Sequence, residues 1–211
     1  TTLKHHFKTT KTKKTICQLQ KQTKMKKLTF ALLLLSFHAH AQDVFNGCPL
    51  KGDNSNNRVQ AVDSLKNRYQ IPTGYKEISW QYITTLKVTD SYTPEAVQLT
   101  GYIMDIKDGG SESCNCHSTV YKDTHIYITE AQNETNAGKA IIVEATPRFR
   151  AALGTTAQLK ANYLHKKVTV CGYLFRDDEH KANSTADNGK GNLWRASVYE
   201  IHPIIKIYIV K

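Results

Sequence analysis

In the C-terminal half of the chain, apolar and polar residues follow the two-residue repeat of β-strands in several separate runs. VQLTGYIMDIK (97–107) and THIYITE (124–130) alternate, and KAIIVEAT (139–146) is a short β-branched run. Two later runs, KVTVCGYLFRD (167–177) and LWRASVYEIHPIIKIYIV (193–210), are again rich in β-branched and aromatic residues. Such runs are typical of strands that bury one face, so we predict five strands.

Between the third and fourth runs lies PRFRAALGTTAQLKANYLHKK (147–167), which is rich in Ala, Leu and Lys and predicts one or two helices. The predicted order is three strands, a helix and two more strands, and the last strand continues past a bend at Pro203. This is the order of elements in the OB-fold barrel. We therefore predict a mostly β protein with an OB-like five-stranded barrel over residues 96–211. Gly101 and Gly172 suit the sharp strand bends that a small barrel needs.

The two longest loops of the predicted barrel span residues 107–122 and 176–192. They join strands 1 to 2 and 4 to 5, which in OB barrels bind ligands together with the faces of strands 2 and 3. Loops of this length in a compact domain are usually functional or disordered. We therefore predict a binding module with a cleft between these two loops.

The preceding residues, 42–95, have a less regular pattern. Val59, Val62, Leu65 and Tyr69 follow near-helical spacing before Pro72 ends the run. We predict a small N-terminal extension that packs on the barrel.

The segment MKKLTFALLLLSFHAHA (25–41) has a positive start, a ten-residue apolar core and small residues at its end. This pattern predicts a secretory signal peptide, too short to span a bilayer, and hence a secreted or periplasmic protein without a membrane anchor after cleavage. Residues 1–24 carry no apolar periodicity, and we interpret them as untranslated or artefactual sequence ahead of Met25.

The net charge of the chain is much smaller when the predicted leader and signal peptide are not counted. The whole sequence has 29 basic and 18 acidic residues, a net charge of +11. Residues 1–41 contain nine lysines and no acidic residue, so 20 basic residues face 18 acidic ones in the remainder, a net charge of +2. The strong basicity that would favour a nucleic acid or an anionic membrane as partner therefore disappears.

Several motifs resemble a family of secreted bacterial proteins with an OB-type domain and no assigned activity. They are GYIMDIKDGGSESCNCHS, KDTHIYI, IIVEATPR, DDEH and NLWRASVYEIHP, and they extend over residues 97–207. The resemblance implies the fold and the secretion, and it implies no reaction.

Four cysteines lie beyond the leader, and an even number in an oxidising compartment predicts disulfides. A bond between Cys114 and Cys116 would close a small, strained ring, and Cys171 lies mid-strand, where it suits a small buried apolar residue. Cys48 is therefore the expected partner of Cys114 or Cys116. Metal ligation and a reactive thiol are the alternatives for these cysteines.

Acidic, histidine and arginine residues gather near the ends of the predicted strands. An acid or imidazole that activates water beside an arginine suits phosphodiester hydrolysis. A secreted hydrolase that acts on phosphodiesters, with or without a metal ion, is therefore the alternative to a binding module. The other interpretation is that these are surface or hydrogen-bonded residues of the strand ends. The candidate catalytic residues are Asp123, His125, Glu144, Arg148, Glu200 and His202.

The binding module would hold its ligand with side chains from the strand faces and the second long loop. Nucleic acid, oligosaccharide and protein are the ligand classes open to an OB barrel, and nucleic acid has weak support from the charge. The candidate ligand-binding residues are His125, Tyr127, Arg148, His180 and Arg195.

Metal ligands and cofactors are not assigned by the sequence. His117, His125, His180 and His202 could join Cys114 or Cys116 around zinc, but their spacing matches no zinc motif. The acidic triplet 177–179 lacks the pattern of a calcium loop. We therefore predict no metal site, and the cofactor stays unknown.

Overall fold

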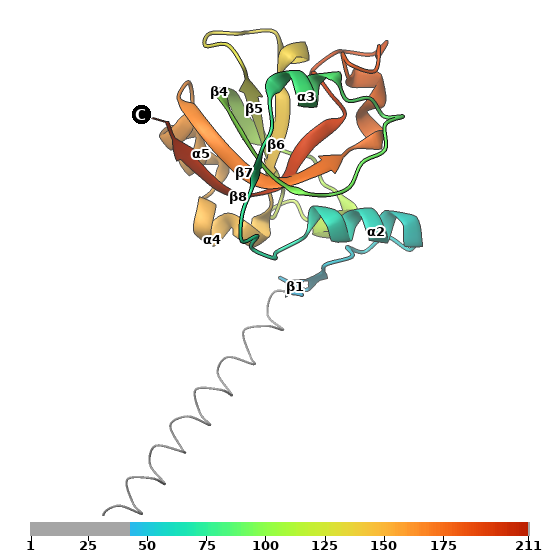
Figure 1. Ribbon diagram of the computed structural model, residues 1–211. Coiled ribbons are helices and arrows are strands. Elements are labelled where there is room, and N and C mark those ends of the chain that lie inside the picture. The colour runs from blue at the N-terminus through green and yellow to red at the C-terminus, as the bar shows by residue number, and fades with distance from the viewer. Residues whose placement is uncertain (1–42, 211) are drawn as a thin grey trace, which may run out of the picture. The chain divides into compact units, whose positions relative to one another are not determined.

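A computed structural model describes residues 43–210, and the predicted leader and signal peptide lie outside them. Five strands form a closed mixed barrel in the order β4-β5-β6-β8-β7, with β4 pairing back onto β7 (Figure 1). The parallel β6–β8 pair and the antiparallel neighbours complete the OB-like topology that the sequence predicts. The strands are β4 (Ala96–Asp108), β5 (Thr124–Thr129), β6 (Ile141–Ala145), β7 (Lys167–Arg176) and β8 (Tyr199–Ile209).

The predicted helical segment between the third and fourth barrel strands is confirmed as two short helices. They are α4 (Arg150–Leu153), which follows the 3-10 turn η3 (Pro147–Phe149), and α5 (Thr156–Tyr163). Gly154, at φ 99°, separates them, and Thr155 and Gln158 form a capping box that starts α5.

The interior of the barrel is apolar because one residue in two along each strand points inward. On β5 and β6 the inward set is Ile126, Ile128, Ile141 and Val143, all fully buried. The side chains between them therefore point to the outer face of the barrel.

Gly172 allows β8 to bend around the barrel at the point where the β7–β8 register shifts. A Cβ atom at this position would lie 2.3 Å from the carbonyl oxygen of Pro203. The predicted role of this glycine in strand bending agrees with this close approach.

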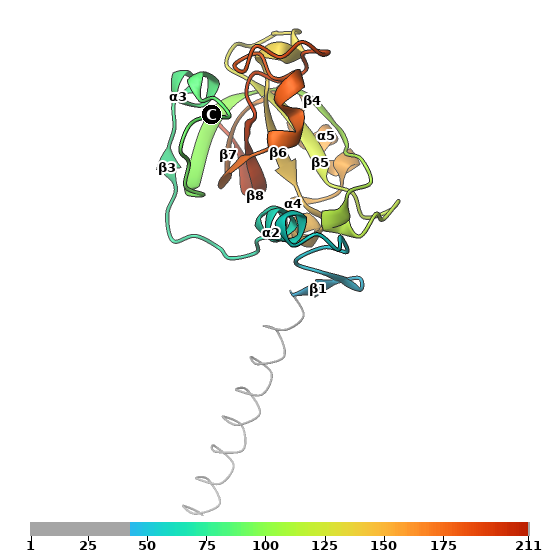
Figure 2. The same ribbon diagram turned by 90° about the vertical axis from the view of Figure 1, so that its right-hand side faces the viewer.

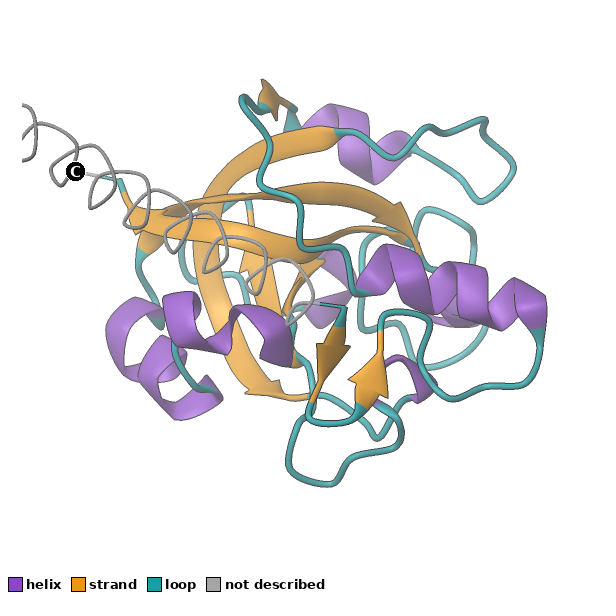
Figure 3. Ribbon diagram, turned by 90° about the horizontal axis from the view of Figure 1, so that it is seen from below, coloured by secondary structure: helices purple, strands orange, loops and turns teal. Residues whose placement is uncertain are grey.

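Residues 45–95 of the N-terminal extension pack on the barrel through short elements (Figure 2). Ile83 is fully buried in the barrel core, and the Trp80 indole donates to the carbonyl of Thr100 at 2.8 Å. Figures 1 and 2 place α2 and α3 at opposite ends of the barrel, and Figure 3 shows the helices outside the strands. The elements are β1 (Val44–Phe45), β2 (Cys48–Pro49), α2 (Asn57–Lys66), β3 (Lys76–Glu77) and α3 (Trp80–Thr85).

The last strand begins at Tyr199, so the prediction that Arg195 lies on it is wrong. Residues 195–196 pair instead with the second long loop: Thr185 N donates to Arg195 O and Ala186 N to Ala196 O. The second long loop also contains the 3-10 segment η4 (Asp178–Asn183). No helix in the part of the chain from 43 to 210 has the length and apolar character to cross a membrane.

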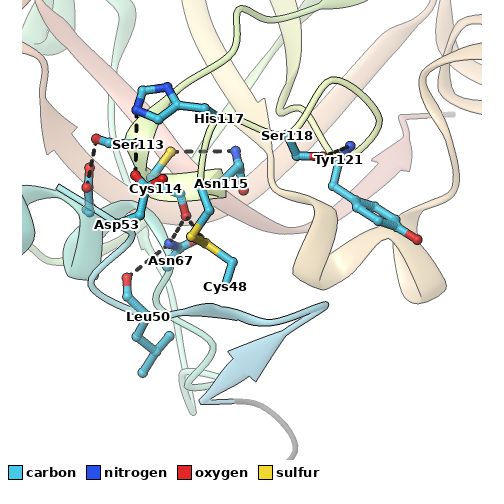
Figure 4. The surroundings of a disulfide bond; sticks show 12 residues. Cys48, Leu50, Asp53, Asn67, Ser113, Cys114, Asn115, His117, Ser118 and Tyr121 are labelled. Carbon is cyan, nitrogen blue, oxygen red and sulfur yellow. Dashed lines mark hydrogen bonds and ion pairs between the residues drawn. A yellow bond between two sulfur atoms is a disulfide. The ribbon is translucent and has the colours of Figure 1, made fainter.

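The predicted disulfide joins Cys48 to Cys116, with 5.7 Å between the Cα atoms (Figure 4). It ties the extension to the first long loop, next to the 3-10 turn η1 (Ser113–Asn115). The Asn67 amide holds the same two segments together by donating to Leu50 O and Cys114 O. Cys114 and Cys171 are free and buried.

Replacing Cys48 and Cys116 together by alanine should lower the free energy of unfolding by roughly 4 kcal/mol, because the bond closes a loop of 68 residues in the unfolded chain. Urea unfolding of oxidised wild type and variant measures the difference, and non-reducing peptide mapping identifies the bond. A change below about 1 kcal/mol would contradict this expectation.

Candidate functional site

A cluster of acidic and histidine side chains lies on the outer face of β5, β6 and β8. We call Asp123, His125, Glu144, Glu200 and His202 the outer-face cluster. His125 and Glu144 are paired across β5 and β6, and Val143 pairs with Ile201 across β6 and β8, which brings Glu200 and His202 to the same side. Four of the five are buried, and the side chain of His125 is 15% exposed.

The distances within the outer-face cluster are short. His202 Nδ1 lies 3.1 Å from Glu200 Oε1 and 3.3 Å from Glu144 Oε2, and its Nε2 lies 3.8 Å from Asp123 Oδ2. His125 Nε2 lies 3.3 Å from Glu144 Oε1. Five of the six predicted catalytic residues are therefore neighbours in space.

Burial shifts the protonation of this cluster. It raises the pKa of Asp123, and together with the charge of Glu200 it raises the pKa of Glu144 well above the ordinary value. Burial also lowers the pKa of His125. Each shift favours the neutral form of the side chain.

Arg195 connects the outer-face cluster to the second long loop. Its guanidinium donates to Asp177 Oδ2 at 2.7 Å, to Glu200 Oε2 and to Ser197 O at 2.8 Å. Burial would raise the pKa of Asp177, but the hydrogen bond with His180 and the charge of Arg195 hold it well below its usual value. Arg195 is completely buried, so this is an internal ion-pair network rather than a surface one.

Lys66 and Glu112 form a further ion pair at the edge of the cluster, and neither residue was predicted to belong to a site. The Lys66 ammonium, from the last turn of α2, lies 2.6 Å from Glu112 Oε2 in the first long loop. Burial alone would lower the pKa of Lys66, but the charge of Glu112 raises it well above its ordinary value. The one feature of the sequence that could have indicated Lys66 is its spacing from Asp63, since two charged residues one turn apart lie on the same side of a helix.

The thiol of Cys114 contacts carboxylates. Its Sγ lies 3.7 Å from Glu112 Oε2 and 3.7 Å from Asp123 Oδ2, in hydrogen-bonding geometry. Burial, followed by the charge of Asp123, raises the pKa of this thiol. A neutral, buried thiol is a poor nucleophile, so the structure gives no support to a reactive cysteine here.

The remaining predicted residues lie apart from the cluster. Arg148 Nη2 donates to Cys48 O at 2.9 Å, in the N-terminal extension. Tyr127 is buried in a small apolar group with Trp194, and His180 stacks edge-on against the same indole at 4.9 Å while contacting Asp177 at 2.5 Å. The proposed ligand-binding set is therefore not one continuous surface.

A cavity of about 400 Å³ lies between the two long loops and helix α2. We call it the interloop cavity. Phe175, Val59 and Val62 give it an apolar part. Five carboxyl groups and three basic side chains also line it: Asp63, Glu112, Asp177, Asp178, Glu179, Arg58, Lys66 and Arg176.

Several groups of side chains among residues 43–210 have the spacing to hold a metal ion. They are Glu112, Cys114 and Asp123; Glu112, His125 and Glu144; and Asp123, Glu144 and His202. Glu112 thus borders both the interloop cavity and the outer-face cluster.

The chain matches no protein-family model, no curated protein and no solved structure.

Replacing Arg195 by methionine should lower the free energy of unfolding by about 3–5 kcal/mol, because Asp177 and Glu200 lose a buried partner. Asp178→Asn is the control, since its partner Arg176 is partly exposed and such pairs contribute about 1 kcal/mol or less. Urea unfolding measures both. Equal effects of the two substitutions would contradict a buried network.

The contribution of His180 to stability should fall as pH rises. Its hydrogen bond to Asp177 raises its pKa above 6.5, although Arg195 opposes this. The folded protein therefore binds the proton more tightly than the unfolded chain. The stabilisation is complete below about pH 6 and is lost as pH passes the higher folded pKa.

The stability difference between wild type and His180→Gln, measured by urea unfolding across this pH range, checks that expectation. A difference that stays constant, or grows with pH, would contradict it.

Proposed function

We propose that this protein is a binding module, exported by its signal peptide, that holds a small cationic ligand in the interloop cavity. The observation that carries the proposal is the position of the cavity. Both long loops line it, and its size is within the range of small-molecule sites, which is about 300–1,000 Å³. Ligand-binding loops on a rigid barrel are the usual arrangement in this architecture.

The charge of the lining favours a cation. Three of the five carboxyl groups are already paired: Glu112 with Lys66, Asp178 with Arg176, and Asp177 with Arg195. Of the charged groups in the lining, that leaves Asp63 and Glu179 beside Arg58, a surplus of one carboxyl group. Phe175 and the two valines would contact an apolar part of the ligand. A ligand with an ammonium or guanidinium group on a short carbon chain fits this lining.

Nucleic acid has less support than a cationic ligand. Its phosphates would face the surplus of carboxyl groups, and the charge of +2 beyond the leader supplies little attraction. Tyr127, the aromatic residue among the candidate ligand-binding residues, is 4% exposed and packs against Trp194, so it is not available to stack on a base.

Phosphodiester hydrolysis also has less support. A catalytic group must reach the substrate directly or through one water. Asp123, Glu144, Glu200 and His202 are 0–4% exposed, beneath the loops and α2. Arg148, the predicted source of positive charge, contacts the N-terminal extension instead.

Titration calorimetry with a matched pair of probes tests the proposal. We expect 1,5-diaminopentane to bind and glutarate, the dicarboxylate of the same length, not to bind. Glu179→Gln should weaken diamine binding by about fivefold, because an exposed ion pair contributes modestly. Glu134→Gln, outside the cavity lining, is the control and should bind as wild type does.

Preferential binding of glutarate, or equal affinity of wild type and Glu179→Gln, would contradict the proposal. Binding of a single-stranded oligonucleotide that weakens steeply with salt would favour the nucleic-acid alternative.

A further inference from the structure

Three side chains of the outer-face cluster converge from different parts of the barrel. Asp123 precedes β5, Glu144 lies on β6 and His202 on β8, and each offers a ligand atom within 4.8 Å of the other two. Their side chains are 0–6% exposed. The fold therefore fixes a potential coordination site on rigid strands rather than on flexible loops.

Each of these three residues also has a buried polar atom without a hydrogen bond to the described part of the chain. The atoms are Asp123 Oδ1, Glu144 Oε2 and His202 Nε2. Buried polar atoms almost always have a partner, because leaving one unpaired costs about 1–3 kcal/mol. Three unpaired atoms on converging side chains indicate a bound group that accepts lone pairs.

His202 has the surroundings of a metal-bound histidine. Its Nδ1 contacts Glu200 Oε1 at 3.1 Å, and Glu200 is fixed in turn by Arg195. Histidines that bind metals commonly donate one ring N–H to a carboxylate, which orients the ring and leaves the other nitrogen free to coordinate. Here that other nitrogen is the unpartnered Nε2.

The charges in this region are unequally balanced. Glu200 is paired with Arg195, and Glu112 with Lys66. Between residues 43 and 210, neither Asp123 nor Glu144 has a lysine or arginine within ion-pair distance, only the imidazoles of His125 and His202. A divalent cation that displaces the protons of these two carboxyl groups would balance their charge in a site that excludes water.

We propose that Asp123, Glu144 and His202 bind one divalent transition-metal ion of the class of Zn²⁺. Imidazole and carboxylate ligands lie about 2.0–2.2 Å from zinc, so neighbouring ligand atoms around a tetrahedral ion are about 3.4 Å apart. His202 Nε2 lies 3.8 Å from Asp123 Oδ2, so this pair requires only a small shift. Glu144 Oε2 lies 3.3 Å from the other ring nitrogen, Nδ1, and the ligand atoms of the three residues lie within 4.8 Å of one another, so Glu144 must move toward Nε2 when the ion binds. His125 and Glu112 form an adjoining ligand group with Glu144 and are the candidates for a fourth ligand.

The site is separate from the interloop cavity, so this inference does not depend on the cationic ligand. Glu144 and Asp123 do not line that cavity. Zinc binding can therefore be observed even if the diamine does not bind, and diamine binding can be observed even if zinc does not bind.

Zinc titration of the oxidised, chelator-treated protein tests the proposal. We expect calorimetry and elemental analysis to give one Zn²⁺ per chain, and thermal melting to shift upward with added zinc. Glu144→Gln and Asp123→Asn should each weaken binding by about 100-fold or more, since changes in outer-shell partners alone cost 10–100-fold. Glu134→Gln and His180→Gln, which remove a carboxylate and an imidazole outside the three residues, should bind zinc as wild type does.

A readout on the wild-type protein keeps the test independent of variant folding. Zinc should shift the ring nitrogen resonances of His202 in the NMR spectrum, while those of His165 stay unchanged. Without zinc, Glu144→Gln should melt close to wild type, because it replaces a side chain whose burial already favours the neutral form with a neutral one of the same size. The absence of stoichiometric binding by wild type, unchanged affinity in both carboxylate variants, or an unshifted His202 would overturn the proposal.

Discussion

Four carboxyl groups are buried against the outer face of the barrel, and the structure depends on how their charge is balanced. Asp123, Glu144, Asp177 and Glu200 are each 0–5% exposed. Arg195 balances two of them. It lies in a segment, 184–196, whose two ends pair with each other and which also donates from Ala196 N to the carbonyl of Ala140, directly before β6. Removing one buried ion from such a network leaves the others without a partner, so the loop, the strand face and α2 form one energetic unit.

The N-terminal extension and the first long loop, which cover the outer-face cluster, are held in place by contacts of different kinds. The Cys48–Cys116 bond and the Asn67 amide join the extension to the first long loop, and the Lys66–Glu112 pair lies beside them. Without this cover, the outer-face cluster would be solvated like any strand surface. Its unusual protonation is therefore a consequence of the extension as much as of the barrel.

The barrel could be predicted from the sequence because each strand carries its own signal, for example Ile126 and Ile128 alternating with His125 and Tyr127. The same two-residue repeat puts Glu200 and His202 on one side of their strand, whereas the position of Glu144 beside them depends on the pairing of β6 with β8. Arg195, Lys66 and Glu112 were misplaced or missed, since their positions depend on contacts between distant segments, such as the Lys66–Glu112 pair separated by 46 residues. The disulfide was predictable to within one cysteine, and only the loop geometry selects Cys116 over Cys114.

Glu112 is the residue through which the interloop cavity and the outer-face cluster can influence each other. It lines the cavity, pairs with Lys66, and belongs to two of the groups that can hold a metal ion. A cation near Asp123 or Glu144 would compete with Lys66 for Glu112, and a released Lys66 ammonium would make the cavity less attractive to a cationic ligand. If both proposed cations bind and Glu112 is the fourth ligand of the metal, the two sites would be coupled, and by linkage the coupling would act equally in both directions. The first long loop would then carry the coupling, because Glu112 lies in it, four residues from Cys116 of the disulfide.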